Sequence, residues 1–109
     1  MLPNASLAVV EPSKVRDYLL SPTHPVGRFK SVVFLALGYT PQDWTKLRDD
    51  LLSHAATGEA LPGEPGPYGT KYTVSGNLTG PNGRTSQFRT VWLLDAEASA
   101  PRFLTAYPE

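Results

Sequence analysis

Cysteine is absent from the 109-residue sequence, so neither a disulfide framework nor a thiolate metal site can hold the fold. Long apolar runs are absent too, since none approaches the roughly twenty residues that a membrane-spanning helix needs. The amino terminus lacks the basic stretch followed by an apolar run that marks a secretory leader. We therefore expect an unexported, cytoplasmic protein without membrane association, whose stability comes from packing.

An excess of charge of either sign is the next absence, because ten Lys and Arg residues balance ten Asp and Glu residues. Sequence-independent affinity for nucleic acid comes mainly from cations that neutralise phosphates, so this balance disfavours a general nucleic-acid binder. Acids are concentrated in the middle of the chain, which leaves room for one basic face. The early and late cations are Lys14, Arg16, Arg28, Lys30, Lys71, Arg84, Arg89 and Arg102.

Familiar catalytic and nucleotide-binding motifs are missing as well. No serine sits in a Gly-x-Ser-x-Gly elbow, and the glycines of residues 63–69 are interspersed with prolines and a glutamate instead of forming a phosphate cradle. The two histidines, His24 and His54, fall in different expected elements, with no carboxylate at ligand spacing beside either. We expect no bound metal and no cofactor.

The residues that are present predict one domain over 1–109 with a helical first half. Apolar residues at helical spacing, with proline near two of the starts, predict helices over 11–20, 27–37 and 40–57. The expected buried positions of the central helix are Phe29, Val32, Val33, Ala36 and Leu37. Gly38 would end this helix as a left-handed residue, and Thr40 would cap the next one.

The second half alternates polar and apolar residues, which predicts strands over 68–79, 86–94 and 102–107. Residues 58–67 hold three prolines and predict a loop, as do residues 96–101. The tetrapeptide Gly-Pro-Asn-Gly at 80–83 predicts a type I turn with a left-handed glycine, closing a hairpin. The expected fold is α+β, with about three N-terminal helices packed on one face of a C-terminal antiparallel sheet of about three or four strands.

The segment with the clearest chemical character is residues 21–30, Ser-Pro-Thr-His-Pro-Val-Gly-Arg-Phe-Lys. Prolines on both sides hold His24 on a stiff approach to the central helix, and an imidazole titrates near neutral pH. On the last strand, a two-residue period puts Phe103, Thr105 and Tyr107 on one side. The candidate catalytic residues are His24, Lys30, Thr105 and Tyr107, and the candidate substrate-binding residues are Arg28, Arg89 and Arg102.

These residue types suit RNA cleavage by the substrate's own 2′-hydroxyl, which needs a base, an acid and donors for the developing charge, but no metal. Each residue also has a plainer interpretation. His24 could hydrogen-bond a helix end or a loop carbonyl, and His54 could cap the C-terminus of its helix. Arg28 and Lys30 could form a solvated helix face, Tyr107 the core or rim of the sheet, and Thr105 an ordinary strand position.

The order of short motifs resembles an uncharacterised bacterial and archaeal domain family that occurs as small stand-alone proteins and at the ends of larger toxin-like chains. The motifs are LPNA at 2–5, KVRDYLL at 14–20, HPVGRFK at 24–30, YGTKY at 68–72, TGPNGR at 79–84 and PRFLTAY at 101–107. More distantly, the helical half followed by an antiparallel sheet, with His and Lys early and Thr and Tyr late, resembles the barnase, EndoU and RelE-like ribonuclease toxins.

This second resemblance implies a metal-independent endoribonuclease that acts on RNA. His24 would be its base or acid, Lys30 and Arg102 would bind phosphate, and Thr105 and Tyr107 would orient the scissile phosphate or transfer a proton. The alternative is a non-enzymatic module that binds a cognate protein partner, such as a toxin-antitoxin or operon partner.

Overall fold

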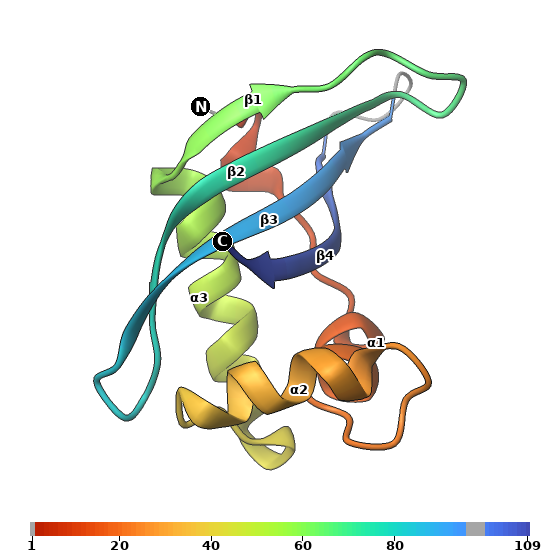
Figure 1. Cartoon of the computed structure of the whole chain (residues 1–109). Helices are drawn as coiled ribbons and strands as arrows, with labels where there is room; N and C mark the ends of the chain where they lie inside the picture. Colours follow the sequence, from red (N-terminus) through yellow and green to blue (C-terminus); the bar gives the residue numbers. More distant parts are fainter. Residues whose placement is uncertain (1, 96–99) are drawn as a thin grey trace.

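The structure is a computed structural model that describes residues 2–95 and 100–109, so most of the expected loop at 96–101 lies outside the described residues. Helical elements fill the first half and strands the second (Figure 1). The helical elements are η1 (Ala5–Leu7), α1 (Pro12–Lys14), η2 (Val15–Leu19), α2 (Gly27–Ala36), η3 (Pro41–Asp43) and α3 (Trp44–Thr57). The strands are β1 (Glu59–Pro62), β2 (Thr70–Thr79), β3 (Thr85–Leu94) and β4 (Arg102–Pro108).

The four strands form one antiparallel sheet in the order β1-β2-β3-β4. Figure 1 shows α3 lying along one face of this sheet, with α2 and α1 below it. The expected α+β architecture is therefore confirmed, with the helices gathered on one side. Among the described helices, none is long and apolar enough to cross a bilayer.

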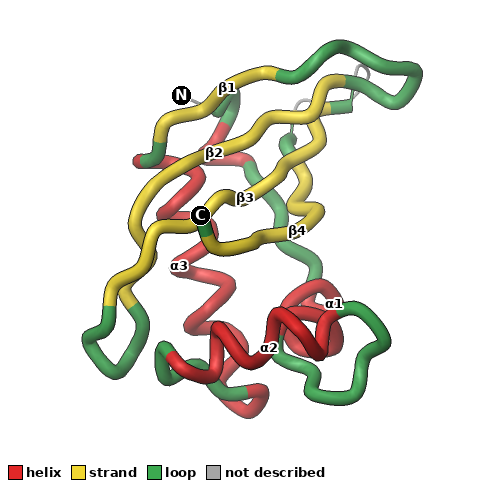
Figure 2. The backbone as a smooth tube through the Cα atoms, in the orientation of Figure 1, coloured by secondary structure: helices red, strands yellow, loops and turns green. Residues whose placement is uncertain are grey.

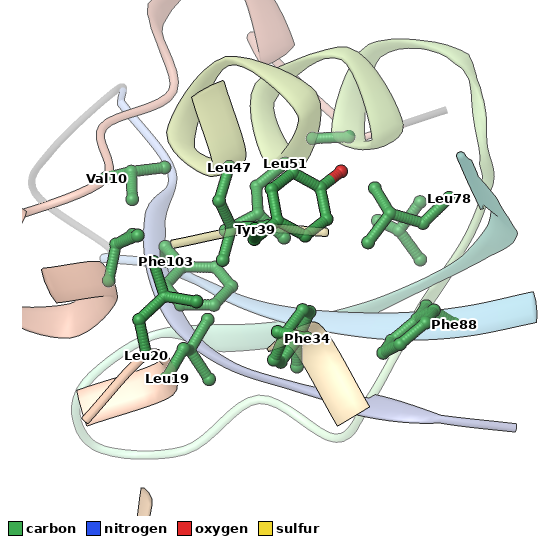
Figure 3. Close-up of a cluster of buried hydrophobic side chains, with 14 of the residues drawn as sticks. Val10, Leu19, Leu20, Phe34, Tyr39, Leu47, Leu51, Leu78, Phe88 and Phe103 are labelled. Carbon is green, nitrogen blue, oxygen red and sulfur yellow. The ribbon is translucent and has the colours of Figure 1, made fainter. Parts of the chain in front are cut away.

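The core lies between α3 and the inner face of the sheet, and Figure 3 shows side chains from both halves of the chain meeting there. Leu47, Leu51 and Ala55 of α3 are fully buried, as their helical spacing predicts. Thr40 caps this helical segment, because its hydroxyl accepts a hydrogen bond from the Asp43 amide at 3.2 Å. Trp92 of the central strand β3 is also fully buried.

The orientation of α2 differs from the prediction. Gly27, Ser31 and Phe34 form its buried face, whereas Phe29 and Val32 are both 68% exposed. The reason is a close approach of backbones, since a Cβ at Gly27 would lie 1.9 Å from the Tyr18 carbonyl oxygen. The small residues of α2 therefore face inward, because only they permit this contact with η2.

The expected loop at 58–67 is partly wrong, because residues 59–62 form the edge strand β1. Residues 59–62 are too few, and end in a proline, for an alternation of polar and apolar side chains to predict a strand. Tertiary packing forms it: Gly58 ends α3 and sits against the sheet, where a Cβ would meet the Val74 side chain at 2.5 Å and the Ser75 carbonyl at 2.8 Å. The chain leaving α3 is thus delivered directly beside β2.

The hairpin turn between β2 and β3 is confirmed. The Gly83 amide donates to the Gly80 carbonyl at 3.0 Å, and Gly83 is left-handed with φ at 85°. In Figure 2 this turn lies next to the C-terminal end of α2. The Asn82 side-chain amide donates to the Ala36 carbonyl at 2.9 Å, and the Asn82 backbone amide donates to the Leu37 carbonyl at 3.2 Å.

The prediction that Phe103 shares a side of β4 with Thr105 and Tyr107 is wrong. Val91 pairs with Thr105 while Trp92 pairs with Phe103, so Leu104 is the extra residue of a β-bulge. Phe103 therefore turns into the core with Trp92. Thr105 and Tyr107 still share the outer face, opposite Val91 and Arg89.

Candidate functional site

His24 begins α2 in the manner of a helix cap. Its ring Nδ1 accepts hydrogen bonds from the backbone amides of Val26 at 3.0 Å and Gly27 at 2.9 Å, and its carbonyl accepts from Arg28 at 3.1 Å. These are the second and third residues after His24, the positions whose free amides an N-cap side chain satisfies. The plainer interpretation of His24, a hydrogen bond to a helix end, is confirmed.

This capping fixes the chemistry of the ring. A nitrogen that accepts from two amides carries no proton, so the neutral ring of His24 has its proton on Nε2. The loop before it is also held, because the Ser21 hydroxyl accepts from the amides of Thr23 at 3.3 Å and His24 at 3.2 Å. His24 is consequently a preorganised hydrogen-bond donor at Nε2.

Tyr18 of η2 joins His24 to β4. Its ring packs edge-on against the His24 ring, with centroids 5.1 Å apart, and its hydroxyl lies 3.1 Å from the Thr105 hydroxyl. We call Tyr18, His24 and Thr105 the Tyr18 cluster. It depends on Gly27, whose missing side chain allows the backbone of Tyr18 to approach α2.

An open pocket of about 510 Å³ lies beside the cluster. It is lined by Ser13, Lys14, Asp17, Tyr18, His24, Val26 and Leu104. The Lys14 ammonium lies 5.9 Å from the centre of the Tyr18 ring. Asp17 is paired with Arg16 at 3.1 Å, and this hydrogen bond lowers the pKa of the Asp17 carboxyl below its ordinary value.

Lys30 and Tyr107 meet farther along β4. The Lys30 ammonium donates to the Ala106 carbonyl at 3.1 Å and lies 5.5 Å from the centre of the Tyr107 ring. Thr105, Ala106 and Tyr107 are consecutive, so the Lys30 contacts and the Tyr18 cluster are adjacent on the same strand. The structure thus groups all four candidate catalytic residues along one edge of the sheet, with Thr105 and Tyr107 as strand neighbours.

Of the three candidate substrate-binding arginines, Arg89 lies opposite Tyr107 on the neighbouring strand, and Arg28 and Arg102 lie apart from it. Arg28 is exposed on α2 with its guanidinium 4.8 Å from the centre of the Phe29 ring. Arg89 on β3 pairs with Glu109 at 2.6 Å, and hydrogen bonds to Glu109 and Tyr107 raise its pKa. Arg102 begins β4 and lies five residues, about 16 Å of extended chain, before Tyr107.

His54 is a structural residue, but the prediction that it caps its helix is wrong. The side chain is buried and bonds to the sheet instead: Nε2 lies 3.1 Å from the Gly76 carbonyl and 3.2 Å from the Phe88 carbonyl, and Nδ1 lies 3.1 Å from the Thr90 hydroxyl. Thr90 in turn accepts from the Trp92 indole at 2.8 Å. The ring therefore joins α3 to the inner face of two strands.

Sequence reasoning missed Tyr18, which looked like one position of an apolar helix stripe. The sequence signal that could have found Tyr18 is its position in the KVRDYLL motif, directly before the proline-flanked segment that carries His24. Across residues 2–95 and 100–109, no three His, Cys, Asp or Glu side chains gather closely enough to hold a metal ion.

The fold and the site define a class: a small α+β domain with helices on one face of an antiparallel sheet and a polar cluster at the edge strand β4. The chain belongs to the family described as Domain of unknown function (DUF6883), which matches residues 1–109. No curated protein matches it.

Among solved structures, the fold is similar to that of a chain in a contact-dependent growth inhibition toxin–immunity protein complex from Klebsiella pneumoniae 342. The TM-score is 0.73 at 19% sequence identity, over 94% of this chain and 100% of that chain. A likeness at this identity shows a shared fold and leaves the chemistry to be argued from the residues.

Proposed function

We propose that the protein is a ribonuclease-like toxin domain that cleaves RNA through the 2′-hydroxyl of its substrate. The observation that carries the proposal is the Tyr18 cluster. Its His24 Nε2 and its two hydroxyls stand beside an open pocket, with Lys14 on the pocket wall and Lys30 on the same strand edge. The shared fold with a chain of a toxin–immunity complex supports a toxin role.

The reaction needs a base, an acid and groups that stabilise the developing charge. The 2′-oxygen bonds to phosphorus while the bond from phosphorus to the 5′-oxygen breaks, leaving a 2′,3′-cyclic phosphate and a 5′-hydroxyl. One group takes the 2′ proton, another gives a proton to the 5′-oxygen, and cations and donors stabilise the charge on the phosphoryl oxygens. The site must carry donors and cations at one phosphate, and His24 and Lys14, which line the same pocket, favour such a site.

His24 holds the proton on Nε2 in this arrangement, so we assign it as a donor to a phosphoryl oxygen. The one carboxylate among the described residues lining the pocket is Asp17, which we assign as the base for the 2′ proton. Thr105 keeps the expected role of orienting the phosphate, with the Tyr18 hydroxyl beside it. Tyr107 keeps the expected role of transferring a proton, and we assign its hydroxyl as the acid that protonates the leaving 5′-oxygen. Arg102 and Arg28 would bind phosphates of the RNA on either side of the cleaved bond, because such contacts need no precise placement at the reacting phosphate.

The experiment is cleavage of a mixed-sequence RNA in EDTA, with product ends identified by mass spectrometry. We expect products that end in 2′,3′-cyclic phosphate, and no cleavage at a 2′-deoxy linkage. His24→Asn keeps a capping acceptor but removes the ring, and it should lower the rate about 100-fold. Tyr18→Phe should also slow cleavage, whereas Tyr68→Phe, in an exposed loop, should not. An inactive parent protein, or full activity in His24→Asn, would refute the proposal.

A second candidate is the non-enzymatic module that binds a cognate protein. It is favoured by the structural use of the same residues, since His24 caps α2 and Lys30 closes part of the β4 edge. This function needs no reacting group, so it predicts intact RNA and a stable complex with a partner. The RNA assay separates the two candidates directly.

A further inference from the structure

Helix α2 and Val26, the residue directly before it, present a row of large apolar side chains to solvent. Phe29 and Val32 are each 68% exposed and Val26 is 55% exposed. They follow one another at three-residue intervals, so they form one row along the helix, which we call the α2 stripe. Exposed apolar groups that gather on one element mark interaction surfaces more often than single exposed residues do.

The exposure is imposed by packing on the other side of the helix. Gly27 and Ser31 face inward, and a side chain at Gly27 would collide with the Tyr18 carbonyl. Rolling α2 to bury Phe29 would bring larger residues to this contact, where there is no room for them. The helix therefore cannot hide the α2 stripe within its own chain.

The segment that carries the stripe holds cations and no carboxylate, and the nearest acid by sequence, Asp17, is paired with Arg16. The sequence from Tyr18 to Gln42 holds no Asp or Glu but holds Arg28 and Lys30, both on α2. The Arg28 guanidinium lies 4.8 Å from the Phe29 ring, so a cation borders the largest apolar group of the stripe. A partner surface that complements this region has an apolar centre and acidic side chains around it.

We propose that the α2 stripe is the docking surface for a different protein chain with an acidic rim and an apolar centre. Phe29 is the central anchor, because buried aromatic groups carry much of the energy of interfaces. A second copy of this chain fits less well. In a two-fold dimer each residue near the axis meets its own copy, which would bring Arg28 against Arg28.

The position of the stripe links the partner to the pocket, since Val26 belongs to both. A protein seated on α2 would also extend over the pocket mouth, where the acidic rim would meet Lys14. This consequence, inhibition of RNA cleavage by the partner, rests on the proposed function. The docking surface itself does not, because it is argued from exposure, packing and charge alone.

The first test is photo-crosslinking in the native host, with p-benzoylphenylalanine in place of Phe29. The control carries it in place of Tyr68, which is 77% exposed in the loop before β2. We expect an acidic protein, identified by mass spectrometry, to be attached at position 29 and not at position 68. Attachment to a second copy of this chain or to lipid, or no adduct specific to position 29, would overturn the proposal.

The second test produces that protein and titrates it against the purified chain. Phe29→Asp should weaken the Kd at least roughly thirtyfold, and Tyr68→Asp should leave it unchanged. Both variants alter exposed side chains, so equal Tm values confirm that they fold. Binding should also weaken as salt is raised from 50 to 500 mM, because the complementary charges are screened. Equal Kd values for the two variants, or binding that does not change with salt, would contradict the proposed docking surface, whatever the outcome of the RNA assay.

Discussion

Replacement of His24 separates its capping role from its ring chemistry. In His24→Ala the amides of Val26 and Gly27 lose their acceptor, a change that costs about 0.5–2 kcal/mol at other helix starts. The ring contact with Tyr18 is also lost, and aromatic pairs contribute about 0.5–1.5 kcal/mol. We expect a total loss near 2 kcal/mol for alanine. His24→Asn keeps an acceptor in the cap and should lose about half as much.

The assay is thermal unfolding at pH 7 followed by circular dichroism. One kcal/mol shifts the Tm of a domain of this size by about 4–8 °C, so we expect Tm to fall by about 10 °C in His24→Ala and about 5 °C in His24→Asn. Thr23→Ala, in the same exposed segment, serves as the control and should stay within about 0.5 kcal/mol of the parent. Equal Tm values for the alanine and asparagine variants would refute the capping argument.

Two further predictions concern packing and pH. Gly27→Ala should destabilise the fold by about 1–3 kcal/mol, because the added methyl group meets the Tyr18 carbonyl, and denaturant titration should show a larger loss than for Gly66→Ala, whose methyl group meets its nearest neighbour at 3.8 Å. Burial, reinforced by the 2.6 Å hydrogen bond to Asp50, raises the pKa of Tyr39 well above its ordinary value. The folded state therefore keeps the Tyr39 proton at a pH where the unfolded chain loses it. The stability that the protonated hydroxyl gives the fold is complete below about pH 10, the ordinary pKa of tyrosine, and is lost as the pH rises further. Urea unfolding should show a steeper alkaline loss of stability in the parent than in Tyr39→Phe, and identical pH profiles would count against the argument.

Strands β2 and β3 and the helix α3 could be predicted because the apolar residues of each follow one period and define one buried face. A two-residue period with buried Val74 and Trp92 allows one inner face, and the Gly-Pro-Asn-Gly sequence favours one turn. The helix α2 is apolar on both sides, so periodicity did not decide which side is buried. The deciding contact is between Gly27 and Tyr18, two residues in different helical elements, and no local pattern reports it.

Part of the grouping beside β4 could be predicted from residue types, but Tyr18 was missed and the expected Arg28 and Arg102 lie elsewhere. The pattern of residue types grouped His24, Lys30, Thr105 and Tyr107, and the structure places them along one edge of the sheet. Histidine is not a common helix cap, so nothing in the sequence indicated which ring nitrogen would be occupied. Tyr18, the residue that connects the others, was concealed because a tyrosine at helical spacing is indistinguishable from a core residue.

The attachment of the hairpin turn to α2 has a consequence for cooperativity. A helix of ten residues is marginal in isolation, and the last carbonyls of α2 find their donors on Asn82, more than forty residues away. The helix end is completed only when the β2–β3 hairpin has closed. The amides of α2 should therefore exchange with solvent at rates set by opening of the sheet, making this short helix a reporter of the integrity of the whole structure.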